Sequence, residues 1–174
     1  MDRRSSCWLI PAESDYQWIQ REIDIMAERF GAPKFEPHLT LFSPIHLTIS
    51  HDWTEWDNWS AQQSPLVLSG REFSAGDIWS RSLVWEIVST PALQYLRSEI
   101  SQLSSTMPNE SYHPHVSILY HVLPHKHRKE ILASLSDWPP ITFDRISMVS
   151  PALPHSDWQQ VESWETLWTG HLGN

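Results

Sequence analysis

Two short segments of the chain repeat the same order of residue types. Each has a proline, a histidine, an apolar residue, a hydroxyl residue and a second apolar residue, at residues 37–41 and 114–118. Residues two apart in a strand point to the same face, so each segment would present an imidazole beside a hydroxyl. The pairs are His38 with Thr40 and His115 with Ser117. A proline before each histidine suits the first residue of a strand, where no backbone donor is needed.

This repeated pattern predicts a particular chemistry if the two segments meet in one groove. A histidine with a pKa of ~6.5 acts as a base or an acid close to neutral pH. One imidazole can therefore activate water while the other protonates a leaving oxygen. The hydroxyls can donate to phosphate oxygens as charge builds up in the transition state. The pattern predicts cleavage of a phosphate ester without a metal, and a five-membered cyclic phosphate suits it because the leaving oxygen stays tethered.

The elements that must position these segments alternate between strands and helices. Apolar periodicity and turn residues predict strands over residues 7–10, 37–42, 66–68, 73–79, 83–88, 114–120, 141–149 and 160–167. They predict helices over residues 14–30, 51–63, 91–103 and 125–135. Pro44 is expected to end its strand, and residues 150–158 are expected to form a loop. Helices mixed with hairpins favour an α+β fold, and the repeated motif indicates an internal duplication with a weak two-fold pattern.

Composition limits the classes of protein to which the chain can belong. Its 174 residues favour one domain, and 12 basic against 21 acidic residues give a net charge of −9. Long nucleic acid is not expected as a partner, because its binding draws on a dense basic surface. The single cysteine, Cys7, excludes an internal disulfide and a multi-cysteine zinc site, and it fits a cytoplasmic setting. We expect no secretory signal, because the apolar stretch near the N-terminus covers only residues 7–10, and no membrane span, because no apolar run approaches ~20 residues.

Other residues allow competing interpretations. The histidines at 113 and 115, and those at 125 and 127, are two apart, and such a pair on a strand can bind a metal. No third cluster of carboxylates or cysteines accompanies them, so no metal is predicted. Cys7 lies in a strand that looks buried, where a thiol is usually inert. The tryptophans at 53, 56 and 59 are interpreted as a packing stripe.

The paired motifs resemble those of the two-histidine (2H) phosphoesterase superfamily. More narrowly, the chain resembles the cyclic phosphodiesterases of plants and yeast that act on ADP-ribose 1″,2″-cyclic phosphate and nucleoside 2′,3′-cyclic phosphates. The matching pieces are residues 8–11, 35–40, 114–120 and 162–166, which span almost the whole chain. The resemblance implies a bilobal α+β fold with two antiparallel sheets related by a pseudo-two-fold axis, helices outside and a central groove. It implies a single domain over residues 1–174, in which each lobe supplies one motif.

The resemblance also implies which residues form the site. His38, Thr40, His115 and Ser117 match the catalytic quartet of the superfamily. Tyr120 matches a tyrosine near the phosphate, although its strand parity is opposite to that of His115, so a bulge or the strand end must turn it inward. Trp8 and Trp79 match aromatic residues that are candidates for stacking on the base, with an ordinary core or rim role as the alternative. Arg81 can reach an additional phosphate, or it can be a solvated loop residue.

The implied activity needs no metal and no cofactor. The ring would open to leave the phosphate on the 2′ side of a ribose or on the 1″ side of ADP-ribose, with one histidine as base and the other as acid, in either order. The expected partner is a small cyclic phosphate nucleotide bound by a cytoplasmic monomer, without a membrane. One alternative is an enzyme that processes 2′,3′-cyclic phosphates at RNA ends, including those of tRNA, for which the possible basic track is thin. Another is a nucleotide sensor without turnover, which would have little need of two acid–base groups.

Overall fold

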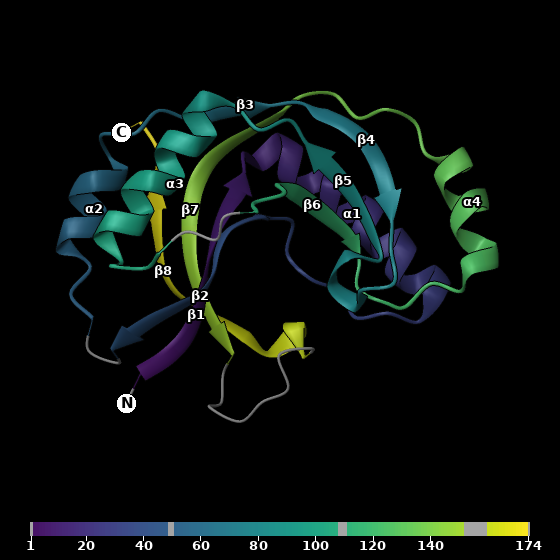
Figure 1. The fold of residues 1–174 in the computed structure, drawn as a ribbon, viewed down its shortest axis with the longest axis horizontal. Helices are drawn as coiled ribbons and strands as arrows, with labels where there is room; N and C mark the ends of the chain where they lie inside the picture. Colours follow the sequence, from purple (N-terminus) through teal and green to yellow (C-terminus); the bar gives the residue numbers. More distant parts are fainter. Residues whose placement is uncertain (1, 49–50, 108–110, 152–159, 174) are drawn as a thin grey trace.

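The computed structural model describes residues 2–48, 51–107, 111–151 and 160–173 (Figure 1). The strands are β1 (Asp2–Pro11), β2 (Leu39–Thr48), β3 (Leu66–Leu68), β4 (Gly70–Ala75), β5 (Leu83–Ile87), β6 (His115–Leu119), β7 (Ile141–Pro151) and β8 (Trp164–His171). The helices are α1 (Glu13–Phe30), α2 (Thr54–Ser60), α3 (Pro91–Leu103) and α4 (His125–Ser134), with short 3₁₀ turns at Trp79–Arg81 and Val161–Ser163. This order of strands and long helices is the one predicted from the sequence.

Within the described residues, eight strands form one antiparallel sheet that has two halves. The strand order is β3-β7-β1-β2-β6-β5-β4, with β8 also paired to β7. The halves meet between β2 and β6, where the described pairing is that of Leu39 with Val116. Figure 1 shows α2 and α3 beside the half that contains β7 and β8, and α4 outside β4. The α+β class with antiparallel strands is therefore confirmed, and the pairing of Leu39 with Val116 joins what were expected to be two sheets into one.

Two boundaries differ from the sequence-based prediction for a physical reason. The expectation that Pro44 ends its strand was wrong, because β2 continues to Thr48. The pairing of β1 with β2 shifts register between Ser5 and Cys7, opposite Pro44. Pro44 has no backbone N–H, but at this irregular position no regular hydrogen bond of the sheet depends on one. The expected loop at 150–158 begins later than predicted, because Pro151 still pairs with Trp164 of β8. Residues 152–159 of that loop lie outside the described residues.

Connections also account for the smaller differences. The hairpin arm predicted at 73–79 lies at 70–75, because the 3₁₀ turn Trp79–Arg81 forms part of the link to β5. The last strand is displaced towards the C-terminus by a second 3₁₀ turn at Val161–Ser163. This turn precedes β8 directly, so the predicted start at residue 160 is too early.

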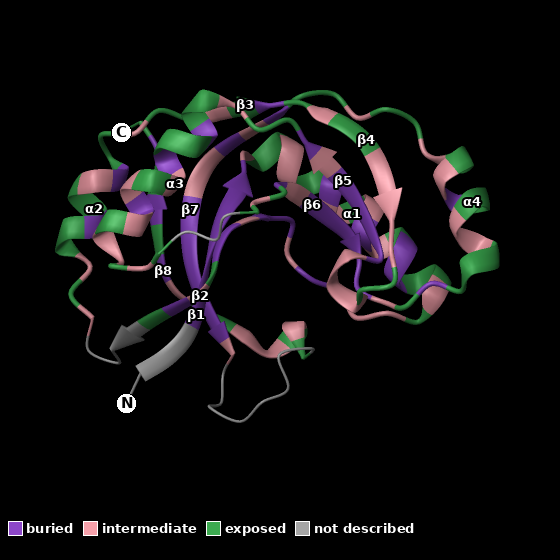
Figure 2. Ribbon diagram, in the orientation of Figure 1, coloured by how far each residue is buried: buried purple, intermediate pink, exposed green. Residues whose placement is uncertain are grey.

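The core lies between the sheet and its helices. Buried apolar residues of α1 and α3 recur at helical spacing, and the hydroxyl of Thr90 caps α3 by accepting from the backbone N–H of Leu93 at 3.2 Å. Figure 2 shows the central strands as largely buried. Trp56 is 1% exposed, and Trp53 stacks on Trp168 with ring centroids 5.6 Å apart. The interpretation of these tryptophans as a packing stripe is confirmed.

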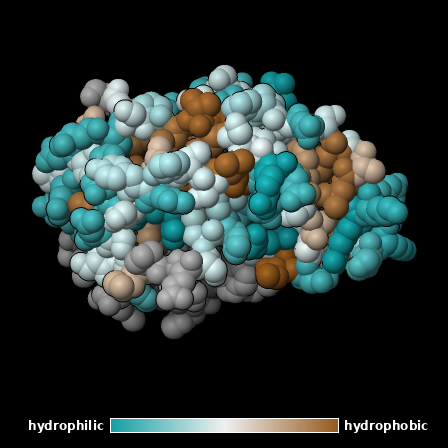
Figure 3. Space-filling model, turned by 45° about the horizontal axis from the view of Figure 1, so that its top comes forward, coloured by the Kyte–Doolittle hydropathy of each residue, from teal (hydrophilic) through white to brown (hydrophobic). Residues whose placement is uncertain are grey.

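The visible surface is mostly hydrophilic. In Figure 3, apolar side chains form a few patches among hydrophilic ones. Large exposed apolar side chains in the described residues are Ile25, Val67, Ile78, Val88, Tyr95, Met107 and Val122. Among the described helices, none is both long enough and apolar enough to cross a membrane.

Candidate active site

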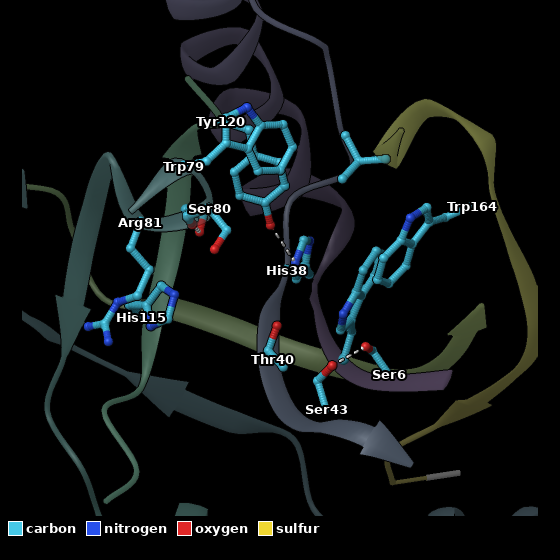
Figure 4. Close-up of a pocket in the computed structure, with 13 residues that line it drawn as sticks. Ser6, His38, Thr40, Ser43, Trp79, Ser80, Arg81, His115, Tyr120 and Trp164 are labelled. Atoms are coloured by element: carbon cyan, nitrogen blue, oxygen red, sulfur yellow. Dashed lines mark hydrogen bonds between the residues drawn. The ribbon is translucent and has the colours of Figure 1, made fainter. Parts of the chain in front are cut away.

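The two histidine motifs lie side by side where the halves of the sheet meet. Leu39 and Val116, which pair across this junction, each follow the histidine of their motif directly. The pairing therefore relates the motifs by a local pseudo-two-fold axis. His38, Thr40, His115 and Ser117 all line one cavity of about 230 Å³ (Figure 4). The structure thus brings together the four side chains that the strand period singled out.

Both imidazoles are oriented by the same backbone interaction. Nδ1 of His38 lies 2.6 Å from the carbonyl oxygen of Glu36, and Nδ1 of His115 lies 2.8 Å from that of His113. A carbonyl oxygen only accepts, so Nδ1 carries the proton in each ring and donates it. Nε2 of each neutral ring is consequently left as the acceptor. Each ring bonds the carbonyl two residues before it, so the pseudo-symmetry extends to the protonation of the rings.

Burial keeps both histidines neutral near pH 7. It lowers the pKa of His38 to about 4, and a charge on His115 would lower it further, whereas the Glu36 carbonyl opposes the shift. Burial also lowers the pKa of His115, and the positive charge of Arg81 adds to this effect. In the protein without a ligand, both rings are therefore neutral, and Nε2 of each carries a lone pair rather than a proton.

Trp8 holds the ring of His38 from one side. The two rings are stacked with centroids 3.7 Å apart and an interplanar angle of 10°. The opposite face of Trp8 stacks on Trp164, with centroids 5.4 Å apart. Both faces of Trp8 are thus covered by other rings, although the residue still lines the groove. Trp164 also lines the groove; the sequence placed it in a matching piece but not among the site residues.

Tyr120 reaches the groove because it follows the end of a strand. β6 ends at Leu119, so the strand alternation no longer decides where Tyr120 points. Its ring stacks on Phe35 with centroids 3.9 Å apart, and Trp79 lies at 4.9 Å on a tilted plane. The Tyr120 hydroxyl lies 3.3 Å from Nε2 of His38 and donates to it. Burial raises the pKa of Tyr120 to about 12, so the hydroxyl keeps its proton.

Comparisons with known proteins agree with this geometry. Residues 3–73 match the family model described as cyclic phosphodiesterase-like protein. Three solved structures with the same fold illustrate the likeness. Escherichia coli LigT in apo form has 13% identity and a TM-score of 0.56, and the match covers 100% of this chain and 99% of that one. LigT complexed with 3′-AMP has 14% identity and a TM-score of 0.56, with 100% of both chains covered. TT0787 of Thermus thermophilus has 13% identity and a TM-score of 0.56, with 98% of this chain and 99% of that chain covered.

The family model matches less than half of the chain, and the likeness to the solved structures is one of fold. No curated protein sequence matches the chain. The matched residues 3–73 contain the first histidine motif, and the pairing of Leu39 with Val116 places the second motif beside it.

Further hydroxyls complete the groove. Ser117 donates to the carbonyl oxygen of Ser80 at 3.0 Å, and Ser6 donates to the hydroxyl of Ser43 at 2.7 Å. Ser6, Ser43 and Ser80 line the cavity but were not predicted. Single serines carry no pattern in a sequence, and their places depend on strand register and on the turn before β5. They add donors and acceptors around the position where a phosphate would meet the histidines.

The charged groups at this site are few. Within the described parts of the chain, no group of three or more histidine, cysteine or acidic residues is arranged to hold a metal ion. Among the described residues that line the groove, Arg81 alone carries a permanent positive charge. An anionic ligand in this groove would meet hydroxyl donors, two imidazoles and one guanidinium.

Proposed function

We propose that the protein is a metal-independent cyclic phosphodiesterase. It opens nucleoside 2′,3′-cyclic phosphates, ADP-ribose 1″,2″-cyclic phosphate or both, and it leaves a 2′- or 1″-phosphomonoester. The observation that carries this proposal is the matched orientation of His38 and His115, whose Nδ1 atoms are both engaged by backbone carbonyls while both rings line one cavity. The match of residues 3–73 to the cyclic phosphodiesterase-like family supports the substrate class. The complex of LigT with 3′-AMP adds that a protein with this fold binds a mononucleotide.

The reaction needs one proton acceptor and one proton donor. One neutral imidazole removes a proton from water through Nε2, and the water oxygen bonds to phosphorus. The bond from phosphorus to one ribose oxygen breaks, and the other imidazole, protonated, gives that oxygen its proton. Thr40 donates to a non-bridging oxygen as its charge increases, and Ser117 does so once its hydroxyl turns from the Ser80 carbonyl to the phosphate. The ring opens with the uptake of one water molecule, and both histidines can exchange roles in the reverse direction.

Substrate binding supplies the protonation state that the free protein lacks. Both histidines are neutral near pH 7, whereas the reaction needs one of them protonated. A negative phosphate beside an imidazole favours the charged imidazolium and so raises its pKa. We infer that the cyclic phosphate itself recruits the proton of the general acid. The assignment of acid and base stays open, because the two sides of the site are alike.

The aromatic residues divide between support and recognition in this proposal. Trp8 has both faces covered, so we assign it to holding the ring of His38 rather than to stacking on a base. Trp79 lies in the 3₁₀ turn at the rim of the groove, which leaves it as the candidate for contact with the base. Tyr120 must release Nε2 of His38 when substrate enters, and its hydroxyl then becomes a donor to the phosphate.

A substrate panel with product assignment tests this function. The protein would be incubated in EDTA with the four nucleoside 2′,3′-cyclic phosphates, with ADP-ribose 1″,2″-cyclic phosphate and with an RNA oligonucleotide ending in a 2′,3′-cyclic phosphate. Phosphorus NMR would identify the products. We expect ring opening of the small substrates to 2′- or 1″-monoesters in EDTA. Turnover of the oligonucleotide alone would replace the proposal by RNA-end processing, and binding without turnover of any substrate would replace it by a nucleotide sensor.

A further inference from the structure

Arg81 lies at the meeting point of two cavities. It closes the 3₁₀ turn Trp79–Arg81 between β4 and β5, and it lines the groove with the two histidines. Figure 4 shows its side chain next to His115. It also lines a second cavity of about 200 Å³ with Ser74, Ala75, Gly76, Asp77 and Ile78. The guanidinium therefore lies beside the reacting position and borders an adjoining space.

The contacts of Arg81 leave donors available for a ligand. A guanidinium carries five N–H donors. One of its nitrogens lies 3.5 Å from Oε1 of Glu86, at the long limit of a hydrogen bond, while Ser74 donates to the same oxygen at 2.7 Å. The Arg81 side chain is 34% exposed, against 16% for Glu86. Glu86 thus holds the guanidinium loosely at the edge of the groove.

Other arginines of the chain are bound more closely. Arg97 donates to the carbonyl oxygen of Leu41 at 3.1 Å, and its guanidinium lies 3.6 Å from the ring centre of Tyr112. Arg145 donates to the carbonyl oxygen of Pro11 at 2.6 Å. These arginines connect parts of the fold, whereas Arg81 meets one carboxylate at 3.5 Å. Arg71 is also held loosely, 3.6 Å from Glu72, but it does not line the groove. The loose contact together with the place in the groove indicates that Arg81 is positioned for a ligand.

Because the protein is negatively charged, a ligand with two phosphates needs a positively charged side chain near the groove. The net charge is −9, so a second anionic group near the groove would be repelled on average. Guanidinium and phosphate match geometrically and form two parallel hydrogen bonds. The proposed ring opening uses the hydroxyls and imidazoles of the quartet and assigns no role to Arg81.

We propose that Arg81 binds a second phosphate group of the substrate and so selects cyclic phosphates that carry a further phosphate over plain nucleoside cyclic phosphates. This inference rests on the proposed function, because it assumes that the quartet holds the cyclic phosphate. Glu86 competes with the ligand for Arg81 and keeps the guanidinium oriented while the site is empty. The cavity that Arg81 shares with residues 74–78 provides space beside it.

Equilibrium binding of two product analogues tests this role without requiring turnover. The probes are adenosine 2′-phosphate and adenosine 2′,5′-bisphosphate, measured by calorimetry at fixed salt. We expect the wild type to bind the bisphosphate about tenfold more tightly, since a charge-assisted pair of this kind is worth roughly that factor. Arg81→Gln should remove this preference, so that the affinity for the bisphosphate falls about tenfold more than the affinity for the monophosphate. Arg81→Lys should keep part of the preference, because it keeps the charge but not the planar fork.

Two further variants sharpen the outcome. Glu86→Gln should strengthen bisphosphate binding by about threefold, because it removes the competing carboxylate. Arg71→Gln is the matched control: it removes the same charge from an exposed position on β4 and should change neither affinity. Equal loss of both ligands in Arg81→Gln, or no preference in the wild type, would overturn the proposal. A bisphosphate preference without turnover in the substrate panel would support the subsite while overturning the proposed function.

Discussion

The hydroxyl of Tyr120 donates to Nε2 of His38 across 3.3 Å, although the two residues are 82 positions apart. This bond occupies the lone pair that the proposed reaction uses. The ring of His38 is fixed at its other nitrogen by the Glu36 carbonyl and on one face by Trp8. The free protein therefore holds His38 in a single orientation and tautomer, with Tyr120 as a replaceable partner at the reacting atom.

Removing the Tyr120 hydroxyl should impair catalysis without unfolding the protein. Tyr120→Phe keeps the ring that stacks on Phe35 and deletes the hydroxyl that we propose as a donor to the phosphate. A hydrogen bond to a charged group is worth roughly 1.5–3 kcal/mol, so we expect kcat/KM to fall by at least about tenfold. Tyr95→Phe deletes an exposed hydroxyl on α3 and serves as the control. An unchanged kcat/KM in Tyr120→Phe would show that this hydroxyl takes no part in the reaction.

Trp8 should act through His38 rather than through the base. In Trp8→Leu the imidazole loses its stacked neighbour and becomes more hydrated, so its pKa should move up from about 4 towards the ordinary value. We expect kcat to fall by about tenfold or more, KM to change less, and the acidic limb of the pH profile to shift upward. Trp8→Phe should recover much of the loss. A rise in KM alone, with an unshifted profile, would instead assign Trp8 to ligand binding.

The lowered pKa values of both histidines determine the pH at which kcat/KM should be greatest. The reaction needs one neutral and one protonated imidazole, so kcat/KM should follow a bell between the two free-enzyme pKa values. The pKa of His38 is about 4, and that of His115 lies below 6.5. We expect the maximum of kcat/KM on the acidic side of pH 6.5, measured with adenosine 2′,3′-cyclic phosphate at constant ionic strength. A maximum above pH 7 would contradict these assignments.

Burial of neutral His38 should also make the fold sensitive to acid. Its pKa is about 4 in the folded protein and about 6.5 when unfolded, so the unfolded chain binds more protons between these values. The stability contribution is fully present above pH 6.5 and is lost as the pH falls towards 4. It amounts to at most about 3 kcal/mol. Urea unfolding would be measured for wild type and His38→Gln at pH 7 and pH 4.5. The free energy of unfolding should decrease less in the variant than in the wild type when the pH is lowered. Equal decreases in both proteins would refute the linkage.

The sequence was informative wherever strand alternation alone decides the geometry. A period of two places His38 beside Thr40 and His115 beside Ser117, and these four residues do meet in one groove. The repeat of the motif also indicated the pseudo-two-fold relation, which is now seen in the pairing of Leu39 with Val116. Such arguments need only local structure, which apolar patterning predicts well.

Features that depend on register or on chain ends could not be derived in the same way. Trp8 stacks on His38 because it pairs with Thr40 on the neighbouring strand β2. No local sequence pattern indicates which residues of two strands are paired. Tyr120 turns inward because β6 ends at Leu119, one residue earlier than the pattern indicated. Ser6 and Ser43 meet at an irregular part of the β1–β2 pairing. In each case the decisive fact is where two segments meet, and this is set by packing of the whole sheet.

The central claim is that His38 and His115 act together on one phosphate, and single-turnover kinetics tests it most directly. Rates would be measured on adenosine 2′,3′-cyclic phosphate in EDTA for wild type, His38→Ala, His115→Ala and the double variant, with His171→Ala on β8 as the control. We predict that each single variant loses ~10²–10⁴-fold in rate and that the double variant loses much less than the product of both. A single variant that retains nearly wild-type turnover would contradict the account.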